Sequence, residues 1–347
     1  MTHFIQDWLR LRLRPTFGSR MVIGVPYSWL LVLFLIPFFI VLKISFAEQE
    51  IAIPPYSPLW SYDADMARAT VHLSFVNYQD IFVNFWQTLK GEFNPFNLLV
   101  KITGSGSLKE TFASWGVLSE TGNNIYLKTY ISSFFIAIVT TLLCLLFGYP
   151  IAYAIARMNP KYRNGVLLAI MLPFWTSFLL RVYAWMGLLS TNGIINNFLA
   201  RFGIAPLDMY YNTFSLLLVM VYAYLPFMVL PLYTQLIKLD SRLLEASADL
   251  GAGPIKSFWT ITWPLSRAGI IAGSMLVFIP AVGEFVIPEL VGGPENLMIG
   301  KVLWNAFFDQ NNWPQASAIA VIMVILLVIP IALFHRYETR ELEGEAS

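Results

Sequence analysis

Charged residues are scarce in this sequence. Asp, Glu, Lys and Arg make up 12% of its 347 residues, whereas a soluble domain usually contains about 25%. Hydrophobic residues make up 57%, and the mean hydropathy is +0.63. Hydrocarbon makes charge costly and requires backbone polar groups to bond one another, so this composition predicts an integral membrane protein. The formal net charge of +1 gives no reason to expect a nucleic-acid partner.

Cysteine and histidine are also rare. Cys144 is the single cysteine, so no intrachain disulfide can form, and its apolar surroundings in the sequence suggest a packing role. Three scattered histidines, among them His335, supply neither a metal cluster nor a catalytic constellation. The glycine–lysine spacing of a P-loop is missing, and the GSGS segment at 104–107 is typical of a flexible turn. We therefore expect no metal, no cofactor, no ATP site of that kind and no intramembrane enzyme.

Long uncharged stretches are what the sequence has instead. A bilayer core requires about 20 apolar residues per helix, and barrel strands would be shorter and alternating. Six stretches fit: residues 21–42, 129–156, 164–189 (with Arg181 toward the far end), 208–238, 268–287 and 315–334. The first is too long for a signal-peptide core and is interpreted as a retained anchor. The sequence thus predicts an all-α polytopic fold with six transmembrane helices.

The distribution of basic residues predicts the orientation of these helices. Arg and Lys gather in alternate connections: Arg10, Arg12, Arg14 and Arg20, then Arg157, Lys161 and Arg163, then Lys238, Arg242, Lys256 and Arg267, then Arg336 and Arg340. Cytoplasmic loops carry such an excess, so both termini are expected in the cytoplasm. The expected organisation is a cytoplasmic tail (1–20), a first transmembrane helix (21–46), a periplasmic loop (47–125), a five-helix transmembrane domain (126–335) and a cytoplasmic tail (336–347).

The long loop between the first two spans is acidic. Between Glu48 and Ile125 it contains eight acidic and four basic residues. Such an excess fits a solvated surface, and it also fits a docking face or a vestibule that attracts cations.

The connection between the fourth and fifth spans, 238–266, is amphipathic rather than turn-like. Asp240 or Ser241 is a plausible N-cap, and Gly251 is expected to end the helix that follows. Downstream, the connection continues through a second short segment. Five residues of this connection form a spaced pattern in the sequence, in which Glu and Ala are followed by Gly, then Ile, then Pro: Glu245, Ala246, Gly251, Ile261 and Pro264.

This spacing resembles the cytoplasmic "EAA" loop of type I ABC importer permeases. Ser247 stands where the family has a second Ala, and Trp263 stands where it has Leu. The resemblance implies the fold of that family, with a coupling helix that enters a groove on a separate ATPase subunit. An amphipathic helix resting on the membrane is the competing interpretation of the same pattern.

Three other segments, 172–187, 221–231 and 273–290, look like parts of putrescine and spermidine permeases. The chain looks most similar to the first permease subunit of putrescine systems, although residues 86–124 look longer than that form. The resemblance implies a polyamine importer in the bacterial inner membrane. Its implied partners are an ABC ATPase dimer, a second homologous permease subunit, a periplasmic substrate-binding protein and the lipid bilayer.

A pathway for a polycation needs carboxylates and aromatic faces. Glu284 is the candidate carboxylate because it lies in a stretch interrupted by Pro280, Gly283 and Pro288. It could instead be a structural partner of Arg181. Aromatic residues that could form the walls, or equally an interfacial belt, are Trp175, Tyr183, Trp185, Tyr222 and Tyr224.

Two further functions compete with this interpretation. An ABC permease for another small solute would share every feature of the 238–266 connection. A secondary transporter would need no coupling helix and would usually show inverted repeats, which are not apparent here.

Overall fold

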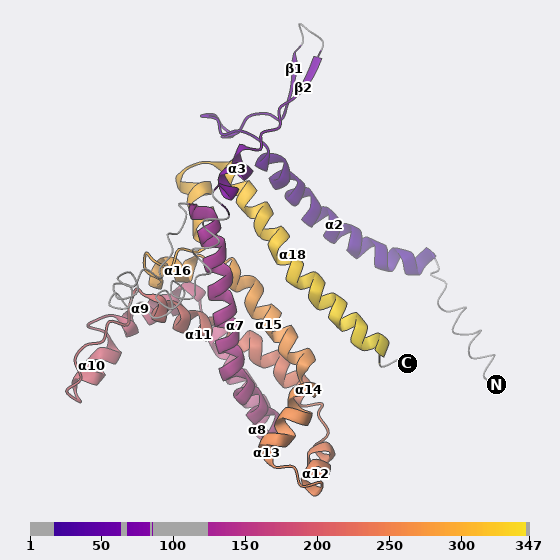
Figure 1. Ribbon diagram of the computed structural model, residues 1–347, viewed down its shortest axis with the longest axis vertical. Coiled ribbons are helices and arrows are strands. Elements are labelled where there is room, and N and C mark those ends of the chain that lie inside the picture. Colours follow the sequence, from indigo (N-terminus) through magenta and orange to yellow (C-terminus); the bar gives the residue numbers. More distant parts are fainter. Residues whose placement is uncertain (1–16, 64–67, 84, 86–123, 345–347) are drawn as a thin grey trace, which may run out of the picture. The chain divides into compact units, whose positions relative to one another are not determined.

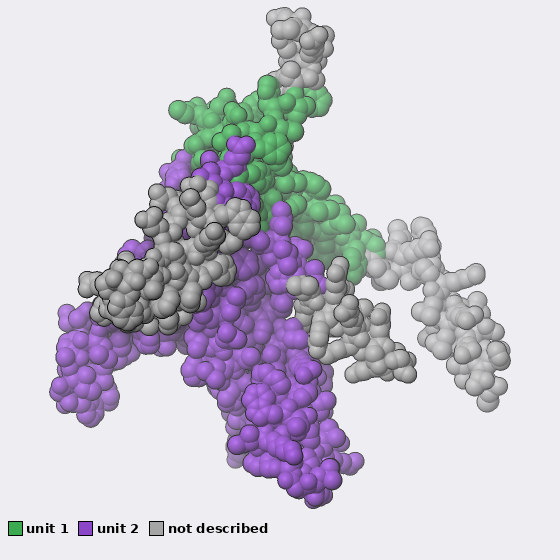
Figure 2. Space-filling view, viewed as in Figure 1, with its two compact units in different colours: residues 1–78, 311–322 green, residues 79–310, 323–347 purple. Residues whose placement is uncertain are grey.

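The computed structural model describes residues 17–63, 68–83, 85 and 124–344 (Figure 1). The chain divides into two compact units, residues 1–78 with 311–322 and residues 79–310 with 323–347 (Figure 2). The predicted turn at 104–107 and nearly all of the 86–124 segment lie outside the described residues. The same holds for the first sixteen residues of the predicted N-terminal tail and the last three of the C-terminal tail.

The first unit contains one long helix followed by a short hairpin. Helix α2, Phe17–Ser45, covers the predicted first span. Strands β1 (Trp60–Asp63) and β2 (Arg68–Val71) pair antiparallel, with Trp60 opposite Val71. Helical periodicity gave no sign of this hairpin, although Trp, Tyr, Thr and Val in these segments favour strands. The all-helical prediction thus holds for the apolar segments, and the connection between the first two of them adds a small sheet.

A buried asparagine ties helix α3, Val76–Phe82, to the end of α2. The Asn77 amide donates to the carbonyl oxygens of Ser45 at 3.1 Å and Ala47 at 2.9 Å. The Ser45 and Tyr78 hydroxyls lie 2.7 Å apart. These bonds satisfy the carbonyl groups that the end of a helix leaves free.

The second unit is almost entirely helical. Its longest helices are α7 (Ile125–Arg157), α11 (Thr213–Leu236), α15 (Arg267–Val282) and α18 (Trp313–Gly344), whose residues 313–322 belong to the first unit. Shorter helices connect them: α8 (Pro160–Met171), η1 (Leu172–Trp175), α9 (Phe178–Leu189), α10 (Ile194–Ala200), α12 (Ser241–Asp249), α13 (Pro254–Ser257), η2 (Phe258–Thr262), α14 (Trp263–Leu265), α16 (Val286–Val291), α17 (Ile299–Trp304) and η3 (Asn305–Asp309).

The core of the second unit lies where α7, α11 and α15 pack together (Figure 1). Cys144 of α7, Met228 of α11 and Val277 of α15 are fully buried there. The packing role predicted for Cys144 is therefore confirmed. Close approach depends on Gly269, because a Cβ at this position would lie 2.9 Å from the Pro231 carbonyl oxygen of α11.

The predicted third span is wrong as a single helix. The chain leaves the α-helical conformation after Met171, and Thr176 is extended before α9 begins at Phe178. Pro173 contributes to the break because it has no N–H group to continue the hydrogen bonds of α8, and the chain passes through the short turn η1 before it becomes extended at Thr176. The apolar segment long enough to cross a membrane is instead 178–200, which joins α9 and α10.

The other apolar stretches form helices as expected. The described residues contain five helices long and apolar enough to cross a membrane, or six if the bent pair 254–265 and 267–282 counts as one. The break predicted near Gly283 is present, because α15 ends at Val282 and α16 begins at Val286. Glu284 therefore lies on irregular backbone, in the break between α15 and α16.

Candidate functional site

The 238–266 connection folds as two short helical pieces separated by glycine. The Asp240 side chain caps α12 by accepting from the Arg242 N–H at 3.0 Å. Gly251 follows the helix with φ +78°, a conformation that side chains rarely adopt. Of the two N-cap candidates, Asp240 is the cap and Ser241 is the first helical residue, and the predicted stop at Gly251 is confirmed.

The five motif residues are not gathered at one point. Glu245 and Ala246 are exposed on α12, and Gly251 is exposed beyond its end. Ile261 and Pro264 are half-buried in the second segment. The exposed residues on and after this short helix form a surface that another protein can contact, whereas Ile261 and Pro264 are less accessible.

Ser247 has a role that the sequence did not reveal. It is buried, and its hydroxyl forms a hydrogen bond with the buried hydroxyl of Ser257 in α13. The alanine expected at this position by resemblance could not make that bond. The serine at position 247 therefore joins α12 to α13 by a hydrogen bond, which an alanine of similar size could not form.

A second buried bond joins the connection to α7. The Tyr149 and Ser266 hydroxyls lie 2.9 Å apart. The Tyr149 ring also contacts Phe258 and Trp263, with centroid distances of 5.4 Å and 5.5 Å. Tyr149 was not among the predicted functional residues. The sequence feature that could have identified Tyr149 is its position, because it is a tyrosine with a hydroxyl group near the end of the apolar stretch 129–156.

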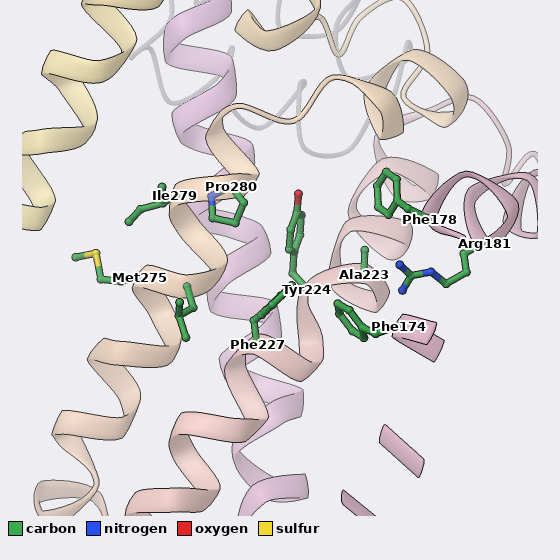
Figure 3. A pocket seen from close by; sticks show the side chains of 10 residues that line it. Phe174, Phe178, Arg181, Ala223, Tyr224, Phe227, Met275, Ile279 and Pro280 are labelled. Carbon is green, nitrogen blue, oxygen red and sulfur yellow. The ribbon is translucent and has the colours of Figure 1, made fainter. Parts of the chain in front are cut away.

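An open cavity of about 450 Å³ lies among α9, α11 and α15 (Figure 3). Its walls are chiefly aromatic and aliphatic, and include Phe174, Phe178, Tyr224, Phe227 and Met275. Arg181 is the one charged residue among the described residues that line it. Figure 3 shows the Tyr224 ring between Pro280 of α15 on one side and Phe174 and Phe178 on the other. The cavity presents ring faces and methylene-binding surface rather than a polar network.

Glu284 borders this region but is bound to its own chain. Its Oε2 atom accepts a hydrogen bond of 2.5 Å from the Tyr224 hydroxyl. Its Oε1 atom accepts from the N–H groups of Phe285 at 3.1 Å and Val286 at 3.0 Å. The carboxylate thus caps the start of α16 and connects it to α11.

Arg181 is not the partner of Glu284. The guanidinium lies over the rings of Phe174 and Phe178, at 4.9 Å and 5.6 Å from their centroids. Its Nε is buried without a hydrogen-bond partner among the described residues. The structural pairing weighed from the sequence is therefore contradicted, and Tyr224 takes the place assigned to Arg181.

The five predicted aromatic residues separate into three groups. Tyr224 lines the cavity, whereas Trp185 and Tyr222 meet edge to face beside Arg181, with ring centroids 5.3 Å apart. Trp175 is 77% exposed and Tyr183 is 53% exposed, and neither lines the cavity. The phenylalanines that line the cavity were not predicted from the sequence. Their side chains carry no polar atom, so in the sequence they look the same as residues that face lipid.

Comparison with known proteins gives consistent matches. Residues 148–343 match the family described as "Binding-protein-dependent transport system inner membrane component". The spermidine/putrescine transport system permease protein PotB of Haemophilus influenzae is 39% identical over 216 residues, which are 62% of this chain and 76% of that protein. PotB of Escherichia coli is 38% identical over 214 residues, covering 61% and 78% of the two chains.

The fold has a counterpart among solved structures. A chain of a bacterial ABC transporter involved in the import of the acidic polysaccharide alginate superimposes with a TM-score of 0.55, covering 92% of this chain and 97% of that one. Sequence identity is 15%, so this likeness concerns the fold alone.

Proposed function

The chain belongs to the family of binding-protein-dependent transport system inner membrane components, and on that premise we propose that it carries polyamines into the cell. It is a multi-pass permease subunit of an ABC importer rather than an enzyme. In the proposal, putrescine, spermidine or both cross the inner membrane at the expense of ATP that a separate subunit hydrolyses. The names of the PotB relatives supply the substrate hypothesis.

The observation that carries the proposal is the aromatic cavity next to Glu284. Polyamines alternate ammonium groups with methylene segments. Ring faces attract the ammonium groups by cation–π contact, and apolar side chains accommodate the methylenes. Tyr224 both lines the cavity and binds Glu284, so an ammonium group that reaches Tyr224 is close to a carboxylate. Such a site binds weakly enough to release its cargo.

The test changes charge without changing shape. Glu284→Gln keeps an acceptor for the Phe285 and Val286 N–H groups but removes the negative charge. A loss of about 1–2 kcal/mol of attraction corresponds to roughly 5- to 30-fold slower uptake of labelled putrescine or spermidine. Uptake is measured in proteoliposomes containing the complete transporter.

Tyr183→Phe is the matched control, because Tyr183 is exposed and lies away from the cavity. Normal polyamine uptake by Glu284→Gln at normal expression would refute a pathway role for this carboxylate. Uptake of a different solute by the wild-type transporter, with none of polyamine, would refute the substrate and leave the permease assignment intact.

The proposed energy coupling runs through α12. Its exposed residues Glu245 and Ala246 are proposed to dock in a groove of the ATPase, and Gly251 allows the tight exit from the helix. Gly251→Val places a branched side chain at φ +78° and costs about 1–2 kcal/mol in this short segment. We expect ATPase stimulation and transport to be lost while membrane insertion stays normal.

Gly253→Val is the control, because Gly253 has an ordinary φ of −69° and also lies in open space. If Gly251→Val still assembles with its ATPase and transports at the wild-type rate, the coupling role is wrong. Uptake by vesicles that lack the ATPase would favour a secondary transporter instead.

The proposed assembly contains an ATPase dimer, a second, homologous permease subunit and a periplasmic binding protein. Both termini are proposed to be cytoplasmic, on the same side as α12, with 126–335 as the transmembrane domain. Cysteines introduced near Arg12 and Gly344 should resist a membrane-impermeant reagent added to intact cells. Labelling at either position would contradict this topology.

A further inference from the structure

Arg181 lacks an anionic partner in the part of the chain that the structure describes. Its guanidinium rests on Phe174 and Phe178, and its Nε is buried without an acceptor. Figure 3 shows the side chain reaching from α9 toward Ala223 and Phe174 at the cavity wall. Ring faces compensate a cation only partly, and an unpaired charge at membrane depth is costly.

Another arginine of the chain, Arg163, has hydrogen-bond acceptors for its guanidinium. Arg163 donates from Nε to the Ile155 carbonyl oxygen at 3.3 Å. Its Nη2 donates to the carbonyl oxygens of Ala156 and Met158, each at 3.0 Å. These acceptors are the free carbonyls at the end of α7. Among the described residues Arg181 has no such acceptors, and the carboxylate of Glu284 is occupied by Tyr224 and backbone N–H groups.

The missing group is better matched by a carboxylate than by a lipid phosphate. One guanidinium edge can bind two oxygens of a carboxylate or of a phosphate. Lipid phosphates lie at the headgroup level, whereas Tyr224 and Phe227 line this cavity from the middle of the apolar helix α11, so a side chain of a neighbouring protein fits this position better. In the cavity the Tyr224 hydroxyl is already donated to Glu284, so the guanidinium is the available donor. A polyamine carries no anionic group and cannot supply the counter-charge either.

We propose that an Asp or Glu side chain of the second permease subunit enters this cavity and pairs with Arg181. The inference rests on the proposed function in that it takes a second permease subunit as the neighbour. The pair completes the wall of the pathway and neutralises a cation that would otherwise repel a polycation. Arg181 thereby helps to hold the two permease chains together as well as setting the charge of the path.

The experiment measures assembly, which does not depend on the substrate. The complete transporter is purified in lipid nanodiscs through a tag on this chain. The amount of second permease chain retained is compared for Arg181→Lys, Arg181→Gln and Arg181→Glu. We expect partial retention for Lys, which keeps the charge but cannot bind both carboxylate oxygens with one planar edge, and roughly tenfold lower retention for Gln and Glu. Arg201→Gln is the matched control, because Arg201 is exposed in the connection after α10.

A second-site search then identifies the partner residue. In the Arg181→Glu background, each membrane-embedded Asp or Glu of the second permease chain is changed to Arg, one at a time. Restored retention at one position supports the pair. The proposal is overturned if Gln and Glu variants assemble normally, or if no reversal of charge restores Arg181→Glu.

The remaining outcomes are also decisive. If wild-type retention depends on anionic lipid and no partner substitution rescues Arg181→Glu, the acceptor is a lipid phosphate and the proposal is wrong. If charge reversal restores assembly but the wild-type transporter takes up no polyamine, the pair stands and the proposed substrate fails. If polyamine uptake is normal and Arg181→Gln changes neither assembly nor uptake, the substrate stands and the pair fails.

Discussion

The helices of the second unit differ in how they meet their neighbours. Helices α7, α11 and α15 bury many side chains against one another, including Met228 at 0% exposure. Helix α8 has no buried residue, and α9 buries only Val182 and Leu189. Helix α8 is less apolar than the other four, but α9 is about as apolar as α7, α11 and α15, so hydrophobicity alone does not explain why α9 buries so little.

What distinguishes them is the fit between surfaces. Lipid tails are as apolar as leucine, so helices associate in a membrane through close packing and polar contacts rather than through burial from water. Gly269 lets α15 approach the backbone of α11, and the Ser266 hydroxyl bonds Tyr149 of α7. Helix α8 contacts the end of α7 through the Arg163 guanidinium and packs partly buried side chains against the core, but it has no close approach of backbones, and the space around its Gly165 is open. The face around Gly165 is available to lipid or to another subunit.

Truncating a side chain inside the packed group should have the largest effect. Met228→Ala leaves a cavity at the meeting point of α7, α11 and α15, and should lower the stability of the isolated chain in detergent by about 2–5 kcal/mol. Leu168→Ala on α8, where the side chain is 55% exposed, should change it by less than about 0.5 kcal/mol. Thermal unfolding of the two variants gives the comparison, and equal losses would contradict it.

Adding one methyl group should produce a smaller difference in stability change between the packed helices α7, α11 and α15 and the less packed helix α8. Gly269→Ala brings a Cβ to 2.9 Å from the Pro231 carbonyl oxygen and should destabilise the chain by about 1–3 kcal/mol. Gly165→Ala meets nothing within 4 Å and should be neutral or stabilising by up to about 1 kcal/mol, because alanine favours helix. A destabilising effect of Gly165→Ala confined to the assembled transporter would show that a partner covers α8.

Removing one hydroxyl should have the smallest effect on stability. Tyr149→Phe deletes the bond to Ser266 and keeps the ring contacts with Phe258 and Trp263, so we expect a loss of about 0.5–1.5 kcal/mol. ATP hydrolysis coupled to uptake should fall further than stability if this bond transmits movement from α12 to α7. Tyr162→Phe, at an exposed ring, is the control. Unchanged coupling in Tyr149→Phe would assign the bond to stability alone.

Local patterns in the sequence predicted the elements and their ends with good accuracy where a polar residue marked them. Asp240 caps α12 and Gly251 ends it, both as expected from short-range chemistry. The interruption around Glu284 was also predicted, because Gly283 and Pro288 disfavour a continuous helix. The third span failed because Pro173 was read as part of an apolar run rather than as a break.

Composition and spacing alone thus determined the class of protein, most of the apolar spans and the two-part helical form of the 238–266 connection, because each depends on residues close together in the chain. The tertiary structure decided which of these residues meet. Tyr224 and Glu284 are 60 positions apart, and Tyr149 and Ser266 are 117 apart. The phenylalanines beside Arg181 follow no pattern that separates a cavity wall from a lipid-facing surface. In an apolar solvent both surfaces favour the same residues, so only the packing of the helices tells them apart.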